Sequence, residues 1–319
     1  EPITAPLVFL ATLLQETHQI KLGTGVFCLP QHHPASVAAQ AALFDHLSKG
    51  RFLMGIGTGS LSSDMELFDV GGSTDRSAMV RESIDHILAI WTQEPPFDRK
   101  GEYWTVALKD LSRQEYGVGA FIKPFQQPHP PISISIMSPN STSARMAGER
   151  GWIPISGASF LQPRYTASHW EQYALGAEAA GRPADPDIWR VSRSIVIAPS
   201  DAEARDYILD PEGAICFWFR YLLSSLRARG LAKFIAPDGH PDPDNVTWQE
   251  AAEDMVTFGS ATTVLDKLVA LRERTGPFGV LTMLTHEWDR PDFCQRSMRA
   301  LVEEVMPALS RHADAAKAA

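Results

Sequence analysis

The spacing of apolar and polar residues between Ile20 and Ser60 predicts a strand, a helix and a second strand in direct succession. Aliphatic residues alternate with small or polar ones from Ile20 to Cys28, and Leu29-Pro30 ends the pattern as a strand ends in a loop. A helix is predicted next, because mostly apolar residues recur every three or four positions and so share one helical face. That face consists of Val37, Gln40, Ala41, Phe44 and Leu47. The apolar run that begins at Phe52 then predicts a buried strand, which completes a βαβ unit.

The same alternation of strands and helices continues along the chain. The predicted strands begin near Ile20, Phe52, Ile132, Trp152, Arg190 and Gly279. Helices are predicted at 7–15, 80–91, 146–150, 202–208, 217–231, 261–275 and 293–309, with a short exposed hairpin or strand at 101–106. Strands that are separated by helical crossovers pair in parallel, so the pattern predicts a parallel α/β protein.

The order of these elements favours a barrel over an open, doubly wound sheet. A doubly wound fold carries a glycine-rich phosphate fingerprint after its first strand, and the run from Gly55 to Ser60 departs from that pattern. We therefore expect a (β/α)8 TIM barrel as a single domain over residues 1–312. Loop insertions are expected at about 107–131 and 232–258, and a frayed tail at 313–319. Because the chain opens on a helix and is two strands short, we expect it to lack the first strand, first helix and second strand of the barrel.

Composition and charge exclude several classes of protein. The chain has 319 residues with 44% hydrophobic content, enough for a large core, and its net charge of −9 argues against a nucleic-acid partner. Three widely spaced cysteines form neither a disulfide framework nor a zinc site, and they suit a reducing compartment. We find no signal peptide and no apolar run approaching about 18 residues. We therefore expect a cytoplasmic protein with no membrane partner and no metal site.

Two stretches of the sequence carry candidate chemistry. Gly55, Gly57 and Gly59 alternate along one strand end, where missing Cβ atoms either fit a tight barrel interior or let a planar ligand lie on the backbone. Met137-Ser-Pro-Asn-Ser-Thr-Ser143 follows a strand and precedes a helix, so hydroxyls, an amide and backbone N–H groups gather at one helix N-terminus. Ordinary helix capping uses the same residue types. Together, the two stretches indicate a nucleotide-type cofactor.

At these positions the sequence resembles a known family. The motifs, in chain order, are LGTGVFCLPQHHP, SKGRFLMGIGTG, MVRESIDHILAIWTQEPPFDRKGEYW and PPISISIMSPNSTSARMAGERGW. They resemble the bacterial-luciferase-like, flavin-dependent monooxygenases, and within them the diketocamphane and limonene monooxygenase group. The resemblance extends from Glu1 to Met306.

The resemblance implies a fold and an activity. The fold would be a luciferase-like TIM barrel that binds FMN, which a separate NAD(P)H:flavin reductase supplies in reduced form. Reduced flavin would capture O2 as a C4a-(hydro)peroxyflavin and oxygenate a small apolar organic substrate. Baeyer–Villiger oxidation of a cyclic ketone or terpenoid is the expected reaction, and a homodimer is the expected assembly.

The resemblance also assigns the cofactor site. Gly25 and Val26 match the strand-end bulge under the flavin ring, and we expect a non-prolyl cis peptide bond between them. Gly57 and Thr58 match the neighbouring strand end. The phosphate loop corresponds to Ser138, Asn140, Ser141 and Ser143. The luciferases carry an arginine where Thr58 stands, so Arg145 or Arg164 is an alternative source of positive charge.

Histidines supply the candidate catalytic chemistry. His33 matches a histidine close to the flavin in the luciferases, where it would hydrogen-bond the flavin or move a proton, with His32 beside it. The alternative is a loop histidine that satisfies backbone groups before Pro34. His286-Glu287 follows the last strand and could line the barrel mouth, but one adjacent pair lacks metal-ligand spacing and is more often a surface pair.

Two further functions remain open at this stage. A deazaflavin (F420)-dependent oxidoreductase would use the same barrel for hydride transfer and would ignore oxygen. A non-catalytic flavin-binding protein would bind the cofactor without turnover. The leading hypothesis is the FMN-dependent monooxygenase.

Overall fold

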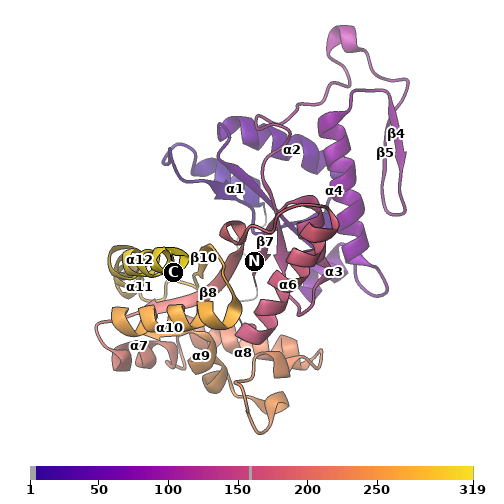
Figure 1. Cartoon of the computed structure of the whole chain (residues 1–319). Helices are drawn as coiled ribbons and strands as arrows, with labels where there is room; N and C mark the ends of the chain where they lie inside the picture. The colour runs from indigo at the N-terminus through magenta and orange to yellow at the C-terminus, as the bar shows by residue number, and fades with distance from the viewer. Residues whose placement is uncertain (1–4, 158–159, 319) are drawn as a thin grey trace. The chain divides into compact units, whose positions relative to one another are not determined.

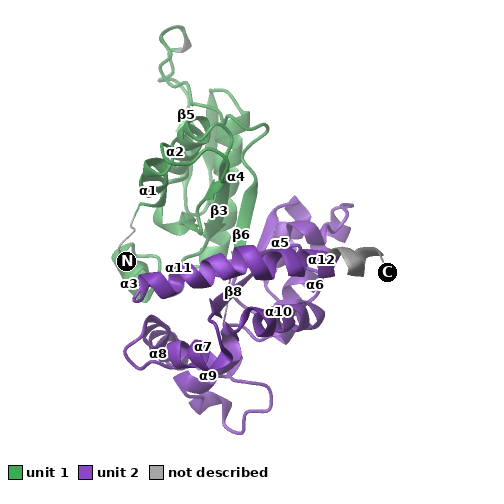
Figure 2. Ribbon diagram, turned by 90° about the vertical axis from the view of Figure 1, so that its left-hand side faces the viewer, with its two compact units in different colours: residues 1–135 green, residues 136–319 purple. Residues whose placement is uncertain are grey.

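The protein divides into two compact units in the computed structural model, which describes residues 5–157 and 160–318. Unit 1 spans Glu1–Ser135 and unit 2 spans Ile136–Ala319 (Figure 2). The boundary falls within strand β6 (Ile132–Ile136), between its last two residues.

Unit 1 is built around the parallel strand β3. Its helices and strands before β6 are α1 (Pro6–Thr12), β1 (Leu22–Gly23), β2 (Phe27–Cys28), η1 (Leu29–Gln31), α2 (Pro34–Leu47), β3 (Phe52–Gly57), α3 (Ser62–Leu67), α4 (Arg76–Thr92), β4 (Phe97–Lys100), β5 (Thr105–Leu108) and η2 (Gln114–Tyr116) (Figure 1). β3 pairs in parallel with β1, with β2 and with β6. The single strand predicted from Ile20 to Cys28 is wrong in one respect, because it consists of two short strands with a break between them.

The core of unit 1 explains the composition of β3. Phe52, Met54 and Ile56 share one face of β3, because alternate residues of a strand point the same way, and all three are fully buried. Between them, Gly55 meets the backbone so closely that an added Cβ would lie 1.9 Å from the carbonyl oxygen of Thr24. The Thr24 hydroxyl bridges the two strands here, donating to the Gly55 carbonyl at 2.7 Å and accepting from the Gly55 N–H at 3.0 Å. Only glycine fits this contact.

An antiparallel hairpin, β4–β5, is attached to α4 through one carboxylate. Glu82 on α4 accepts hydrogen bonds from the backbone N–H groups of Glu102, Tyr103 and Trp104 at 2.7 to 3.2 Å. The sequence predicted a hairpin or strand at 101–106, and the structure confirms a hairpin. Its strands lie on either side of the predicted range, which is mostly the turn.

Unit 2 is built around β8 (Arg190–Ile197), which pairs in parallel with β7, β9 and β10. Its other elements after β6 are α5 (Thr142–Arg150), β7 (Ile153–Ser156), α6 (Pro163–Ala179), η3 (Pro186–Ile188), α7 (Asp201–Ile208), α8 (Ala214–Arg227), η4 (Ala232–Phe234), η5 (Pro243–Asn245), α9 (Trp248–Met255), β9 (Thr257–Gly259), α10 (Ala261–Thr275), β10 (Val280–Leu284), α11 (Pro291–Ala300), the π-helical turn η6 (Leu301–Val305) and α12 (Met306–Ala318) (Figure 1). Strands and helices alternate as predicted, and all pairings of these strands are parallel.

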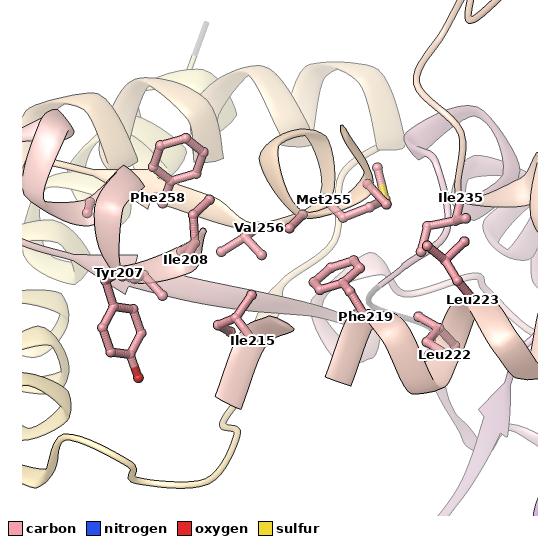
Figure 3. Close-up of a cluster of buried hydrophobic side chains, with 14 of the residues drawn as sticks. Tyr207, Ile208, Ile215, Phe219, Leu222, Leu223, Ile235, Met255, Val256 and Phe258 are labelled. Carbon is pink, nitrogen blue, oxygen red and sulfur yellow. The ribbon is translucent and has the colours of Figure 1, made fainter. Parts of the chain in front are cut away.

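Two cores hold unit 2 together. One lies among α7, α8, α9 and β9 and includes Tyr207, Phe219 and Met255 (Figure 3). The other joins β8 to α10 and η6 around Trp189, which is fully buried. Neither α9 nor β9 was predicted, because a loop insertion was expected at about 232–258. Residues 313–318, expected to be a frayed tail, continue α12 to Ala318.

No helix in the described ranges is both long enough and apolar enough to cross a membrane.

Candidate functional site

The strand ends of unit 1 bring together three of the predicted cofactor residues, Gly25, Val26 and Gly57. The peptide bond between Gly25 and Val26 is cis, as predicted, and lies between β1 and β2. A Cβ on Gly57 would lie 2.8 Å from Cγ2 of Val26, whereas a Cβ on Gly25 would meet nothing within 4 Å. Gly57 therefore lets β3 approach Val26, and the backbone at Gly25 is uncovered. We call these three residues, with Thr58, the strand-end region.

Thr58 follows Gly57 directly and uses its side chain locally. Its hydroxyl donates to the carbonyl of Gly59 at 3.2 Å. Gly59 has φ of +72°, a left-handed conformation that favours glycine, and an added Cβ there would lie 3.3 Å from Cys28 Sγ and 3.4 Å from Gln31 Nε2. The contribution of Thr58 to cofactor binding stays a prediction.

His33 is the N-cap of α2, which supports the structural alternative raised by the sequence. Its Nδ1 accepts from the backbone N–H of Ala35 at 3.2 Å, and its ring meets Trp104 edge to face at 5.5 Å. An accepting Nδ1 places the ring proton on Nε2, so His33 has an N–H donor that the cap does not use. His32 packs against Phe27, and burial lowers the pKa of His32 below its usual value. The catalytic assignment of His33 stays a prediction.

The start of α5 in unit 2 brings together the other four predicted residues, Ser138, Asn140, Ser141 and Ser143. We call them the helix-start region. Ser141 is the N-cap, and its hydroxyl accepts from the Ser143 N–H at 3.2 Å. Asn140 has φ of +51°, a conformation that asparagine tolerates better than most residues. The Asn140 N–H is anchored by Ser168 Oγ at 2.9 Å, so the loop is held to α6.

A buried hydrogen-bond relay fixes the first residue of the helix-start region. Trp189 Nε1 donates to Ser156 Oγ at 2.9 Å, and Ser156 Oγ lies 2.9 Å from Nδ1 of His169. Nε2 of His169 lies 3.0 Å from the Ser138 carbonyl oxygen, which accepts. His169 is fully buried, and this burial lowers its pKa to about 4, so the ring is neutral at neutral pH. The relay runs from Trp189, which directly precedes β8, through β7 and α6 to the loop.

Close packing of α5 on α6 keeps this arrangement in place. A Cβ on Gly148 of α5 would lie 2.0 Å from the Tyr173 carbonyl oxygen, and one on Gly176 of α6 would lie 2.0 Å from that of Arg145. The two glycines permit backbone contact between the helices, which no larger residue would allow.

The alternative sources of positive charge are both paired with carboxylates. Arg145 lies 3.4 Å from Glu149 on the same helix, and Arg164 forms an ion pair with Asp238. Neither guanidinium is dedicated to the helix-start region. Anion binding there would rest on the N-terminus of the nine-residue helix α5 together with the serine hydroxyls.

Each region, taken by itself, suits one chemical group. The strand-end region offers uncovered backbone for a planar group, and the helix-start region offers hydroxyls and a helix N-terminus for a phosphate. Within the described residues, no cluster of three or more His, Cys, Asp or Glu side chains is arranged to hold a metal ion.

Two histidines of unit 2 make buried contacts that the sequence did not predict. His169 belongs to no motif, and its partners are 13 and 31 residues away, so the sequence carries no local sign of the relay. His286 was favoured as part of a surface pair; Glu287 is indeed exposed, but the His286 ring is partly buried. Its Nε2 lies 2.9 Å from Ser194 Oγ, and burial lowers its pKa to about 4. Its position directly after the last predicted strand is what kept a place at the barrel mouth open in the sequence.

The chain belongs to the Luciferase-like monooxygenase family, whose sequence pattern matches residues 2–277. It is 30% identical to 3,6-diketocamphane 1,6-monooxygenase of Pseudomonas putida over 97% of this chain and 85% of the relative. It is 25% identical to limonene 1,2-monooxygenase of Rhodococcus erythropolis over 96% of this chain and 73% of that protein. The family predicted from the four motifs is therefore confirmed.

Solved structures confirm the fold class. The oxygenating constituent of 3,6-diketocamphane monooxygenase from Pseudomonas putida, a type II Baeyer–Villiger monooxygenase in complex with FMN, matches with a TM-score of 0.82 at 30% identity. The match covers 95% of this chain and 83% of that one. The monooxygenase RslO1 from Streptomyces bottropensis matches with a TM-score of 0.74 at 20% identity over 95% of this chain and 83% of that one, which supports the fold alone. The protein is a luciferase-like monooxygenase with a TIM-barrel-type α/β fold.

Proposed function

We propose that this protein uses FMN and O2 to insert an oxygen atom into an apolar cyclic ketone, in a Baeyer–Villiger reaction. One observation carries the proposal. A diketocamphane monooxygenase solved in complex with FMN has the same fold and is 30% identical to this chain, over 95% of this chain and 83% of that one. The hydroxyl-rich helix start at Ser141 supports it independently, because FMN carries a phosphate.

Each region would hold one part of the cofactor. Ser138, Asn140, Ser141 and Ser143 of the helix-start region would bind the phosphate. Gly25, Val26, Gly57 and Thr58 of the strand-end region would lie against the flavin ring. When bound and reduced, FMN supplies the electrons and activates O2. The relay through His169 would act indirectly, by orienting the loop that binds the phosphate.

His33 would supply a hydrogen-bond donor to the reaction. Its Nδ1 is committed to capping α2, so the proton is on Nε2, and that N–H is the group with which His33 would contact the cofactor or oxygen. The Trp104 ring beside it would help to exclude water.

The remaining functional assignments follow from the same proposal. Reduced FMN would come from a separate NAD(P)H:flavin reductase. The enzyme would be a cytoplasmic homodimer, and its substrate would be a small apolar ketone or terpenoid of the kind named in its relatives.

An oxygen-labelling experiment tests the function directly. Protein loaded with photoreduced FMN under nitrogen is mixed with ¹⁸O2 and 3,6-diketocamphane, and products are analysed by mass spectrometry. We expect a lactone that carries one ¹⁸O atom, and none when the protein is omitted or when only oxidised FMN is present. Flavin oxidation with quantitative hydrogen peroxide and no labelled lactone, across a panel of cyclic ketones and terpenes, would contradict the proposal.

One observation favours a second candidate, a deazaflavin-dependent oxidoreductase. The chain is 28% identical to a putative coenzyme F420-dependent oxidoreductase of Mycobacterium tuberculosis over 49% of its length. This candidate predicts binding of F420 and hydride transfer without oxygen uptake. Tight FMN binding that yields neither reaction would instead indicate a non-catalytic flavin-binding protein.

A further inference from the structure

A pocket in unit 2 lies outside both regions that we assign to FMN. It is enclosed by α7, α8 and α11, by the carboxyl-terminal end of β8, and by the end of β10 with the segment that follows it. Its volume of about 40 Å³ has room for a few non-hydrogen atoms but none for a flavin. It therefore suits the end of a small molecule.

The walls of this pocket are mostly apolar. Ile215, Met283, Leu284, Phe293 and Met298 contribute aliphatic and aromatic surface. Ile215 also belongs to the buried cluster of Figure 3, so this wall is part of a packed core. A pocket with such walls gains most from an apolar ligand.

Tyr207 lines the pocket with its polar atom already committed. Figure 3 shows its hydroxyl turned away from the buried cluster, and it donates to Asp289 Oδ1 at 2.8 Å. Cys294 Sγ lies 3.5 Å from the same hydroxyl. Stacking on Phe293, with ring centroids 4.2 Å apart, holds the Tyr207 ring in place. The tyrosine thus shapes the pocket and leaves little capacity to bind a ligand's polar group.

His286 brings a polar ring to the same pocket. Its Nε2 lies 2.9 Å from Ser194 Oγ, and its ring meets that of Trp218 at 5.6 Å. Within 5–157 and 160–318, its other nitrogen, Nδ1, has no hydrogen-bond partner. When the Ser194 hydroxyl donates to Nε2, the proton of the neutral ring is on Nδ1, which is then a donor. A donor among mostly apolar walls matches a carbonyl oxygen on a hydrocarbon frame.

We propose that this pocket binds the carbonyl end of a compact apolar ketone, with Nδ1 of His286 donating to the carbonyl oxygen. Identifying that ketone as the enzyme's substrate rests on the proposed function. Binding itself does not, because it needs no flavin.

The test compares two ligands of nearly equal shape on flavin-free protein. Cyclopentanone and methylenecyclopentane differ mainly in the carbonyl oxygen, and binding is followed through the ring resonances of ¹⁵N-labelled histidine. We expect cyclopentanone to shift the His286 signals and to bind about fivefold more tightly than the alkene, the effect of one hydrogen bond. His286→Phe should abolish that preference and keep alkene binding, and His18→Phe, an exposed histidine of unit 1, should change neither.

Three results would overturn the proposal: equal binding of the two ligands, no binding of either, or a ketone preference that survives in His286→Phe. If that variant does not fold, Ser194→Ala is the substitute, because it removes the hydroxyl that holds the tautomer and should reduce the preference. A protein that prefers the ketone here and never oxygenates it would contradict the proposed function alone. A labelled lactone made by a protein without this preference would contradict the pocket alone.

Discussion

The strand-end region and the helix-start region are built by opposite means. At Gly57, and at Gly55 just before it on β3, the structure depends on the absence of a side chain, because an added Cβ would strike Val26 or Thr24. At Ser138 to Ser143 it depends on polar atoms that are present and are held by hydrogen bonds from α6. The first region is therefore sensitive to volume, and the second to hydrogen bonding and protonation. Substitutions should separate the two.

The largest expected effect comes from adding volume to β3 at Gly55, two residues before Gly57 of the strand-end region. In Gly55→Ala the new Cβ would lie 1.9 Å from a backbone oxygen, which cannot move as a side chain can. We expect a loss of about 3 kcal/mol or more in the free energy of unfolding, at the upper end of overpacking effects. Urea denaturation measures it. Gly71→Ala is the matched control, because its nearest contact is at 3.6 Å and we expect a change within about 0.5 kcal/mol. Equal stabilities of the two variants would refute the volume argument.

The second largest effect should come from protonation of His169, which holds the helix-start region. Burial lowers the pKa of His169 in the folded protein to about 4, below the usual histidine value of 6.5. A depressed pKa means that the unfolded chain binds the proton better, so stability is complete above pH 6.5 and is lost as the pH falls toward 4. Between pH 7 and pH 5 this amounts to about 2 kcal/mol.

His169→Gln isolates that contribution. The variant should lose about 2 kcal/mol less than the natural chain between the two pH values, because it has no imidazole to protonate at this position. His286 titrates equally in both proteins and cancels. His169→Gln also weakens the contact to the Ser138 carbonyl. We therefore expect FMN affinity to fall severalfold while riboflavin affinity changes little. If the free energy of unfolding changes equally with pH in the two proteins, His169 does not titrate as the structure indicates.

Paired ligand titrations sharpen the comparison further. Replacing both Ser141 and Ser143 by Ala removes hydroxyls from the proposed phosphate site, so we expect FMN to bind about tenfold more weakly and riboflavin almost unchanged. Gly57→Ala, with its Cβ 2.8 Å from Val26, should weaken FMN and riboflavin alike. Isothermal titration with oxidised flavins distinguishes the two patterns. If the serine variant loses affinity for FMN and for riboflavin equally, the phosphate binds elsewhere.

How far the sequence predicted these two regions depends on how local their structure is. Gly25, Val26 and the serines around Asn140 lie in short contiguous motifs, so the resemblance located them and the cis peptide bond between Gly25 and Val26. β9 was missed because it has three residues and acquires its identity only by pairing with β8. The relay of His169 joins residues of four separate elements, which no spacing within one segment reveals.

His33 should give the smallest effect on binding and the clearest one on chemistry. We expect His33→Ala to keep FMN affinity within about tenfold, or 1.4 kcal/mol, while the yield of oxygenated product per O2 falls and hydrogen peroxide rises. His33→Ala also removes the N-cap of α2, which alone costs about 1 kcal/mol of stability. His33→Asp separates the two roles, because aspartate caps a helix well and has no N–H to donate. If the Nε2–H acts in the reaction, product yield falls in both variants although His33→Asp is as stable as the natural chain. If His33→Asp retains the yield, capping is the whole contribution of this residue and the reaction draws no proton or hydrogen bond from it.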